Sequence, residues 1–355
     1  MPQGYADLQF RLHVGSPVAA DSPFESDTLW GRVLCALYEG NDAQQALARF
    51  WLDEMTQAAD PDWQPPLILS EGLQCDPDGN PWVPLPLGIS HRLQGSGDPC
   101  VQVAHADAPE RRDEHSRKDL KKIEWVPLGK LAELCEGKPP DPGELIGLDD
   151  IRPRTKPALQ PHLGMNRATS AATKHLLYMA HLDVYSLAEI AFLVKLRQDV
   201  NSELVRLALK RVCDEGWGHS KSRGLGQIRF KSFDPWKAKP QVTDKPTGFV
   251  TLSYFCPRAD DPVEGYWKLA AKHPVPAQFV GGQRVVLGSR KEWRARSLLR
   301  LAPGSCFWFR EGRGFEEHYG RMIGVRELLQ PPNEGDPPLF HYALAYPWPI
   351  ALLQR

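Results

Sequence analysis

The sequence predicts an α+β protein with two ferredoxin-like domains, the second of them rich in strands. Its 355 residues are too many for one small domain. Up to residue 233, helical and alternating apolar patterns follow one another in an order that fits βαββαβ, the arrangement also seen in RNA-recognition modules. From residue 249 onward most apolar stretches alternate as strands do. The prolines and polar residues of 234–248 predict a linker between domains 1–233 and 249–355.

The first three elements follow from local patterns. Residues 5–14 alternate apolar and polar side chains and predict a strand. Ser26-Asp27 is a suitable N-cap for a helix that carries an apolar stripe and ends at Gly40. A second helix is expected directly afterwards, at about 43–58.

The middle of the first domain is less regular. Its proline-rich stretches 67–73 and 81–89 predict short extended pieces, and a long irregular insertion is expected at 91–160. Within the insertion, a short helix is expected after Pro127. Residues 152–174 are basic, lack acidic residues and contain prolines and a glycine, so they are expected to be loop-like.

The second half of this domain is predicted more sharply. Two strands, at 175–185 and 188–197, are expected to enter the sheet. A helix at 202–214 follows, and Asn201 or Ser202 is a suitable N-cap for it.

A glycine-rich loop follows this helix, within the sequence RVCDEGWGHSKSRGLGQIRF at 211–230. Four glycines surround a short basic segment: Gly216, Gly218, Gly224 and Gly226 flank His219, Ser220, Lys221, Ser222 and Arg223. The loop leads into a strand at 227–233, whereas phosphate loops of nucleotide-binding proteins lead into the N-terminus of a helix. Nucleotide binding of that kind is therefore disfavoured. A glycine-rich backbone can instead approach a polyanion closely and offer its N–H groups.

Basic residues gather around this loop. From 206 to 231 there are seven Lys and Arg residues against Asp214 and Glu215, a local balance of +5 in a chain of net charge −1. A second basic segment, at 284–300, interleaves Trp293 with arginines and a lysine. Both segments suit a surface for nucleic acid or an acidic protein. Ordinary solvated turns and hairpins have the same composition, so both interpretations stay open.

Composition and the N-terminal sequence exclude several classes. No uncharged apolar run approaches the length of a transmembrane helix, and no secretory signal is visible, so a cytoplasmic protein without membrane contact is expected. The seven cysteines are scattered and form no CxxC pair, which disfavours a zinc site or a disulfide framework. No metal or other cofactor is expected. The net charge argues against an indiscriminate coat for nucleic acid.

Seven segments, read in order, resemble those of one protein family. They are ESDTLWGRVLCAL (25–37), WVPLPLGIS (82–90), KDLKKIEWVPLGKLAELCEGK (118–138), HLGMNRATSAATKHLLYMAHLDVY (162–185), GWGHSKSRGLGQIRF (216–230), SLLRLAPGSCFWF (297–309) and HYALAYPWPIAL (341–352). They are similar to segments of the RAMP proteins of type III CRISPR–Cas effectors, specifically subunit four of the Csm complex (the Cas "five" group). Trp217 departs from the family pattern, which usually has a second adjacent glycine there, so a stiffer loop is expected.

The resemblance implies a scaffold of two RAMP domains in antiviral defence. Such subunits hold the 5′ repeat-derived handle of the CRISPR RNA (crRNA). They join the large polymerase/nuclease subunit to the first backbone RAMP subunit, and they meet target RNA only indirectly. The corresponding subunit of the Cmr complexes is an alternative with a similar expected fold.

The resemblance and the residue types together give a set of expected RNA contacts. Lys221, Ser222 and Arg223 with the four glycines would form the cradle, with His219 and Ser220 in the same loop. Three further groups are expected nearby: Asn166 and Arg167, His91 and Arg92, and Arg32 on the first helix, which could equally be a surface charge.

Two other function classes remain open from the sequence. A metal-independent endoribonuclease would need a histidine as general base, and the candidates are His219 beside Lys221, His162, and His175 with Tyr178. No pair of them is fixed by spacing, so a non-catalytic RNA-binding subunit is predicted. A metal-dependent nuclease is weaker still, because no HD dipeptide or carboxylate cluster appears. An adaptor that contacts only proteins is the third class.

Overall fold

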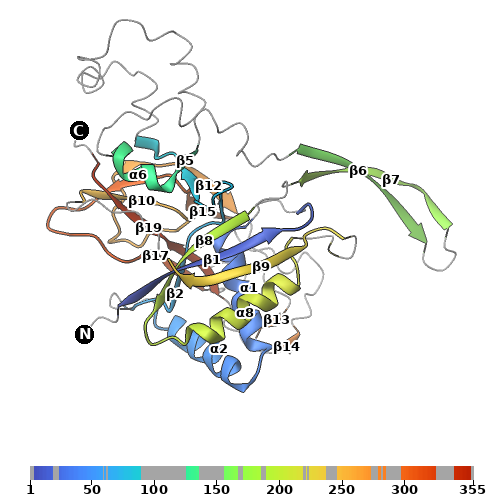
Figure 1. The fold of residues 1–355 in the computed structure, drawn as a ribbon, viewed down its shortest axis with the longest axis horizontal. Coiled ribbons are helices and arrows are strands. Elements are labelled where there is room, and N and C mark those ends of the chain that lie inside the picture. The colour runs from blue at the N-terminus through green and yellow to red at the C-terminus, as the bar shows by residue number, and fades with distance from the viewer. Residues whose placement is uncertain are drawn as a thin grey trace, which may run out of the picture.

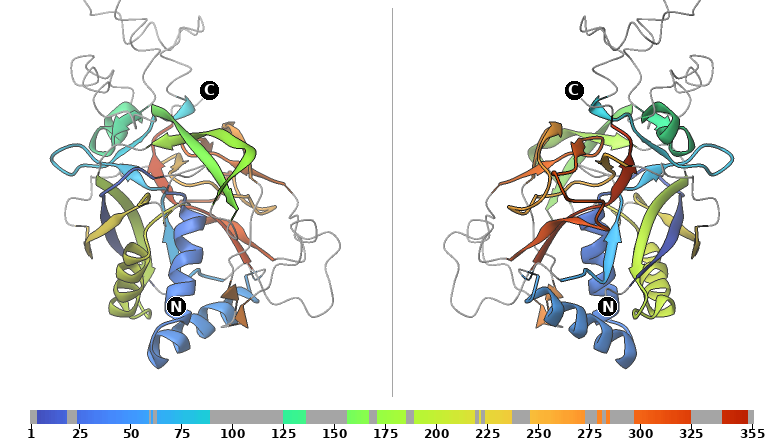
Figure 2. Two further views of the ribbon diagram at one scale, coloured as in Figure 1. Left: turned by 90° about the vertical axis from the view of Figure 1, so that its right-hand side faces the viewer. Right: turned by 90° about the vertical axis from the view of Figure 1, so that its left-hand side faces the viewer.

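The computed structural model describes fifteen ranges of the chain. They are residues 4–18, 24–58, 60, 63–88, 125–135, 156–166, 171–184, 189–218, 221, 224–236, 246–272, 279–280, 283–284, 297–324 and 340–352. The helices α1 (Ser26–Tyr38), α2 (Asp42–Met55) and α8 (Ser202–Asp214) lie on one side of a central sheet, and the strands β10 (Gly248–Thr251) and β19 (Pro347–Ile350) lie on the other (Figures 1 and 2). No helix in these ranges is long and apolar enough to cross a membrane.

The central sheet has the strand order β2-β8-β1-β9, and every neighbouring pair is antiparallel. Its strands are β1 (Tyr5–Val14), β2 (Leu67–Leu69), β8 (Glu189–Arg197) and β9 (Ile228–Pro235), with β3 (Leu73–Gln74) also paired to β8. Because β8 lies between β1 and β2 and is antiparallel to both, β2 is parallel to β1. The first two helices connect these two parallel strands. The predicted strands at 5–14, 188–197 and 227–233 are thereby confirmed as members of one sheet.

The strand expected at 175–185 is present, but it is not part of this sheet, so only its expected place in the βαββαβ unit is wrong. It is β7 (Ala171–Val184), which pairs along its length with β6 (Lys156–Asn166) in a hairpin that projects from the body (Figure 1). The loop expected at 152–174 is also incorrect for residues 156–166 and 171–174. Among the described residues β6 pairs with β7 alone, and proline, which has no N–H to donate, is tolerated in strands at the edge of a sheet.

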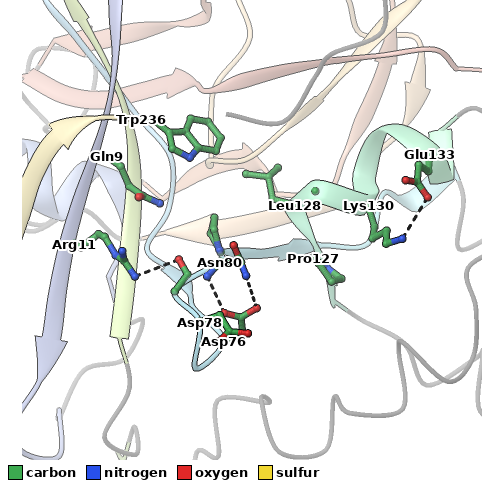
Figure 3. A pocket seen from close by; sticks show the side chains of 13 residues that line it. Gln9, Arg11, Asp76, Asp78, Asn80, Pro127, Leu128, Lys130, Glu133 and Trp236 are labelled. Carbon is green, nitrogen blue, oxygen red and sulfur yellow. Dashed lines mark hydrogen bonds and ion pairs between the residues drawn. The ribbon is translucent and has the colours of Figure 1, made fainter. Parts of the chain in front are cut away.

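Part of the insertion packs against the sheet. As expected, a short helix, α6 (Leu128–Cys135), begins after Pro127, and it follows β5 (Trp125–Pro127), which pairs with β4 (Trp82–Pro84). Between α6, the β3–β4 turn and the helix-free face of β1 lies a pocket (Figure 3).

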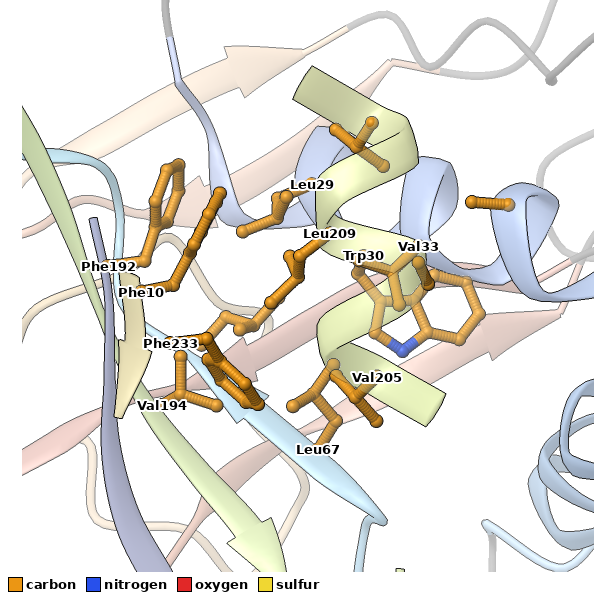
Figure 4. Packing of buried hydrophobic residues seen from close by; sticks show 14 of the residues in the cluster. Phe10, Leu29, Trp30, Val33, Leu67, Phe192, Val194, Val205, Leu209 and Phe233 are labelled. Carbon is orange, nitrogen blue, oxygen red and sulfur yellow. The ribbon is translucent and has the colours of Figure 1, made fainter. Parts of the chain in front are cut away.

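The opposite face of the sheet carries the main core. Phenylalanines of the strands pack against the apolar stripes of α1 (Ser26–Tyr38) and α8 (Ser202–Asp214) (Figure 4). The side chains shown there include Phe10, Phe192 and Phe233 from the sheet, Leu29, Trp30 and Val33 from α1, and Val205 and Leu209 from α8. This contact orients α8, and so fixes where the glycine-rich loop begins.

The helix boundaries were predicted closely, with one error. The N-cap of α1 is Glu25, not Ser26-Asp27, and Ser26 is the first helical residue. The reason is that the Ser26 N–H and hydroxyl both donate to the Glu71 carboxylate, at 3.0 and 2.7 Å, so this side chain satisfies the helix start from outside. The second helix, α2 (Asp42–Met55), starts with a capping box at Asn41.

The described residues after 246 form strands and no helix, which confirms a strand-rich second part without showing a second βαββαβ unit. One sheet has the order β11-β16-β10-β19, and three further pairs are β12–β15, β13–β14 and β17–β18. The bounds are β10 (Gly248–Thr251), β11 (Gly265–Tyr266), β12 (Leu269–Lys272), β13 (Phe279–Val280), β14 (Gln283–Arg284), β15 (Leu298–Leu301), β16 (Cys306–Trp308), β17 (Tyr319–Gly324), β18 (Phe340–Ala345) and β19 (Pro347–Ile350).

Apolar clusters connect the two parts of the chain. The main core includes Tyr342 and Leu344 of β18, and Trp30 of α1 stacks on Tyr342 with ring centroids 6.0 Å apart. A second cluster joins Leu193 of β8 to Val250 of β10. The two parts therefore share buried surface, and the domain division at 234–248 stays a prediction.

Candidate functional site

The backbone of the glycine-rich loop explains its composition. Gly216, Gly218, Gly224 and Gly226 have φ values of +74°, +77°, +81° and +73°. Residues with a Cβ rarely adopt this left-handed region, so glycine is required at each turn of the loop. Four glycines in the left-handed region therefore lie in the segment between α8 and β9.

Backbone hydrogen bonds close the loop at its base. The Trp217 N–H donates to the Gly226 carbonyl at 2.6 Å, and the Gly226 N–H donates to the Pro17 carbonyl at 2.8 Å. The Gly15 N–H donates to the Gln227 carbonyl at 2.8 Å, which ties the loop to the end of β1. A Cβ on Gly226 would lie 1.8 Å from the Trp217 oxygen, whereas one on Gly224 would meet nothing within 4 Å.

Trp217 anchors the loop in the core. Its side chain is 1% exposed, and its ring lies 5.0 Å from that of Phe24 and 6.3 Å from that of Phe192. The Arg32 guanidinium lies over the same ring, 5.3 Å from its centroid. Trp217 therefore anchors one end of the loop in the core, and the expected stiffness of the loop stays a prediction.

Arg32 and Lys221 place two positive charges at this loop. Arg32 donates to the Val212 carbonyl and to Glu215, each at 3.3 Å. Burial lowers the pKa of Arg32, and burial together with the Arg32 charge lowers the pKa of Lys221. The Lys221 side chain is exposed and runs past Gly216, 3.4 Å from where a Cβ would stand. Because the two cations repel each other, an anion bound between them would be stabilised.

Several other basic residues of 206–231 are neutralised by acids. Arg206 bonds to Glu203, Arg211 bonds to Glu39 and Glu215, and Lys231 bonds to Glu189. The local balance of +5 therefore overstates the free charge. Among the described residues of that range, Lys210, Lys221 and Arg229 have no ion pair, and the last two of these are exposed.

Several expected contacts fall outside the described residues: His219, Ser220, Ser222, Arg223, Arg167, His91 and Arg92. Asn166 is the last residue of β6 and pairs with Ala171. The contacts of all these residues with RNA stay predictions, as do those of Arg32, Lys221 and the glycines.

The structure identifies no general base among the described histidine candidates. His162 stands opposite Tyr178 in the β6–β7 register, and His175 lies on β7. Of two other histidines, His318 is buried and His341 is half-buried, and desolvation lowers the pKa of each to about 3, far below the range that suits a base near neutral pH.

No ligand set for a metal ion is found among the described residues. Five described cysteines are free, and burial raises the pKa of the Cys75, Cys213 and Cys306 thiols to about 12. Such thiols are weak nucleophiles at neutral pH.

Sequence reasoning missed a buried charge cluster. Glu25 and Asp27 at the start of α1 bond to Lys272 of β12 and to Arg300 of β15, the latter at 3.2 and 3.3 Å. Arg300 also lies 4.2 Å from the centroid of the Tyr254 ring and is 3% exposed. It belonged to the basic segment expected on the surface, so that interpretation is wrong for Arg300. The cluster joins residues far apart in sequence, and no local pattern indicates it.

The fold, unlike the sequence, has solved counterparts. Neither a family model nor a curated protein matches the sequence. A crystal structure of a Csm1–Csm4 cassette in complex with pppApA contains a similar chain, with a TM-score of 0.52 and 16% identity over 98% of this chain and 100% of that one. A crystal structure of a Csm3–Csm4 subcomplex of the type III-A CRISPR–Cas interference complex also contains a similar chain. Its TM-score is 0.52 and its sequence identity is 15%, over 95% of this chain and 99% of that one. Csm4 is the component common to both complexes, and the chain has the fold of a Csm4-like RAMP protein.

Proposed function

We propose that the chain is a non-catalytic subunit of a type III CRISPR–Cas surveillance complex that binds the 5′ repeat-derived handle of the crRNA. The observation that carries the proposal is the fold likeness, which covers 98% of this chain and the whole of the compared chain. The order β2-β8-β1-β9, with α1 and α8 on one face, supports assigning the first domain to the ferredoxin-like fold.

The glycine loop supplies what handle binding requires. Phosphate contacts need cations and close backbone approach, and they fix position without reading sequence. Lys221 provides an exposed ammonium, and the four glycines provide a backbone without side-chain bulk; Arg32, paired with Glu215, lies at the base of the loop. Ser222 and Arg223 would complete this cradle.

The same chain would bridge two protein partners. The solved counterparts pair Csm4 with Csm1 in one complex and with Csm3 in another. By analogy, this subunit would contact the large polymerase/nuclease subunit and the first backbone RAMP subunit, and would meet target RNA through the complex. The corresponding role in a Cmr-type complex is the alternative.

Co-purification tests this proposal. The chain is tagged and expressed with its genomic neighbours, and any bound RNA is sequenced. We expect short RNAs with one common repeat-derived 5′ end, together with a large polymerase-like subunit. Recovery of the chain alone, with cleavage of repeat RNA in EDTA, would instead identify an endoribonuclease and make His219 the residue to mutate.

RNA affinity as a function of salt tests the loop itself. Lys221→Ala with Arg223→Ala should weaken binding across sequences and lower the salt slope by about 0.7 for each phosphate of a single strand that is no longer neutralised. Lys268→Ala, which removes an exposed lysine between β11 and β12, is the matched control and should change neither. An unchanged slope in the double variant would remove the loop from the site and favour the adaptor.

A further inference from the structure

The helix-free face of β1 and β9 carries polar side chains beside the glycine loop. His13 of β1 stands opposite Arg229 of β9, and both are exposed. The Arg229 side chain lies 3.9 Å from where a Cβ on Gly15 would stand, next to the base of the loop. Farther along β1, Arg11 is paired with Glu189, which also binds Lys231. This polar strip therefore runs from the loop along β1.

The strip ends at the pocket between β1 and α6. The pocket has a volume of about 530 Å³, and Pro81, Pro127 and Leu128 form apolar parts of its wall. Figure 3 shows the indole nitrogen of Trp236 and the carboxamide of Gln9 directed into the same space. Polar and charged side chains of β1, the β3–β4 turn and α6 complete the lining, so the pocket combines apolar wall with hydrogen-bonding groups, as small-ligand sites do.

The wall of the pocket is firmly held. Arg11 donates to the Gly79 carbonyl at 3.3 Å, and the Asp76 carboxylate accepts from the Asn80 N–H at 2.8 Å and from its side chain at 3.0 Å. Gly79 has a φ of +88°, and a Cβ there would lie 1.9 Å from the Arg11 guanidinium. The turn is thus shaped to receive Arg11.

Two polar groups in the pocket have no protein partner among the residues that the structure describes and are available to a ligand. Within the described part of the chain, neither the Trp236 indole N–H nor the Gln9 carboxamide has a hydrogen bond, although Trp236 is 9% exposed with its ring 5.7 Å from that of Trp348. The indole is a donor, and the carboxamide both donates and accepts. A flat molecule with both kinds of group on its edge would satisfy them.

We propose that this pocket receives one unpaired nucleobase of the RNA that the glycine loop holds. The inference rests on the proposed function, because the loop must hold RNA for a base to arrive here. From Gly15 to Gln9 the strand covers about 20 Å, which corresponds to about six nucleotides at stacked spacing and fewer in an extended strand.

The charges of the pocket favour a base over a phosphate. Arg11 is engaged by Glu189 and Lys130 by Glu133, while Asp76 and Asp78 add negative charge to the wall. A phosphate would be repelled, whereas the exocyclic amino group of a base is a donor that carboxylates and carboxamides accept. Recognition of splayed single-stranded bases by such groups is a general mode of RNA binding.

Abasic scanning of the RNA tests the pocket. Synthetic copies of the RNA recovered by co-purification, each lacking one base, are titrated against the full chain. We expect one position, within about six nucleotides of the phosphates held by the loop, at which base removal weakens binding roughly three- to tenfold. Gln9→Leu should bind the intact RNA with a similar loss of affinity. Removing that same base from the RNA should lower the affinity of Gln9→Leu little further.

Two variants keep the test independent of folding. Trp236→Phe retains the ring beside Trp348 and removes the N–H donor, so it should reproduce part of the loss. Gln57→Leu makes the same chemical change at an exposed residue after α2 and should bind like the wild type.

Three outcomes would overturn the inference. In the first, Lys221→Ala weakens RNA binding, but removing any single base has the same effect on the affinity of Gln9→Leu as on that of the wild type. The pocket then receives no base, and the proposed function stands. If Gln9→Leu instead weakens association with a protein subunit, the pocket takes a protein segment. If the wild type binds no RNA, the inference falls together with the proposed function.

Discussion

Gly226→Ala and Gly224→Ala differ in one physical respect, and this makes them a sharp test of the loop. Both residues lie in the same loop, with φ of +73° and +81°. At Gly224 the new methyl group would meet nothing within 4 Å, whereas at Gly226 it would lie 1.8 Å from the Trp217 carbonyl oxygen. The first substitution therefore adds backbone strain alone, and the second adds strain and a backbone clash.

The expected costs follow from these contacts. A left-handed conformation costs an alanine roughly 1–2 kcal/mol, so Gly224→Ala should reduce the free energy of unfolding by about that amount. Gly226→Ala carries the same strain and must also displace Trp217, breaking the 2.6 Å Trp217–Gly226 and 2.8 Å Gly226–Pro17 hydrogen bonds. At about 1 kcal/mol for each bond, the total is about 3–4 kcal/mol.

Urea unfolding of the full chain measures both values, and RNA titration measures the effect on the site. Gly226→Ala should also lose RNA affinity, because the cradle opens at its base, while Gly224→Ala should keep most of it. Equal destabilisation by the two variants would refute the close approach of Trp217 to Gly226. Normal RNA affinity in a folded Gly226→Ala protein would show that the loop shape is irrelevant to binding.

Three further substitutions probe other parts of the argument. Trp217→Ala removes a fully buried ring and should reduce the free energy of unfolding by about 3–5 kcal/mol in urea, with faster hydrogen exchange in the loop. Arg300→Met leaves Glu25 and Asp27 with one fewer buried cation and should cost about 3–5 kcal/mol by the same measurement at pH 7. Burial holds the pKa of His318 at about 3 against an ordinary 6.5, so the unfolded state takes up the proton and stability falls as the pH drops below about 6.5. Between pH 7 and pH 5 the wild type should lose about 2 kcal/mol more than His318→Phe, and an identical pH dependence would contradict the burial of a neutral imidazole.

Local patterns were enough to predict the elements that carry the glycine loop. The alternation in 5–14 and the stripe in 202–214 report which face each element buries, and glycine reports a backbone conformation directly. Strand partners could not be predicted in this way. The segment at 175–185 alternates like a sheet strand, but it pairs with residues 156–166 because a hairpin satisfies its hydrogen bonds without the main sheet.

Charge patterns misled for a related reason. A run of arginines in the sequence gives no sign of which of them meets an acid in the folded chain. Arg300 is buried against Glu25 and Asp27, and Arg211 is engaged by Glu39 and Glu215. Net local charge is therefore a weak guide to a nucleic-acid surface, and the exposed, unpaired cations Lys221 and Arg229 are a better one.

Trp217 reconciles a glycine-rich loop with a specific binding role. Four glycines alone would give a loop with many conformations, and binding would have to offset the entropy of ordering them. Here the ring of Trp217 is buried between Phe24 and Phe192, and its N–H is bonded to the Gly226 carbonyl, so the two ends of the loop are held together without a ligand. Preorganisation of this kind improves affinity without new contacts. The buried ring of Trp217 is therefore compatible with the proposed role of this loop in binding RNA.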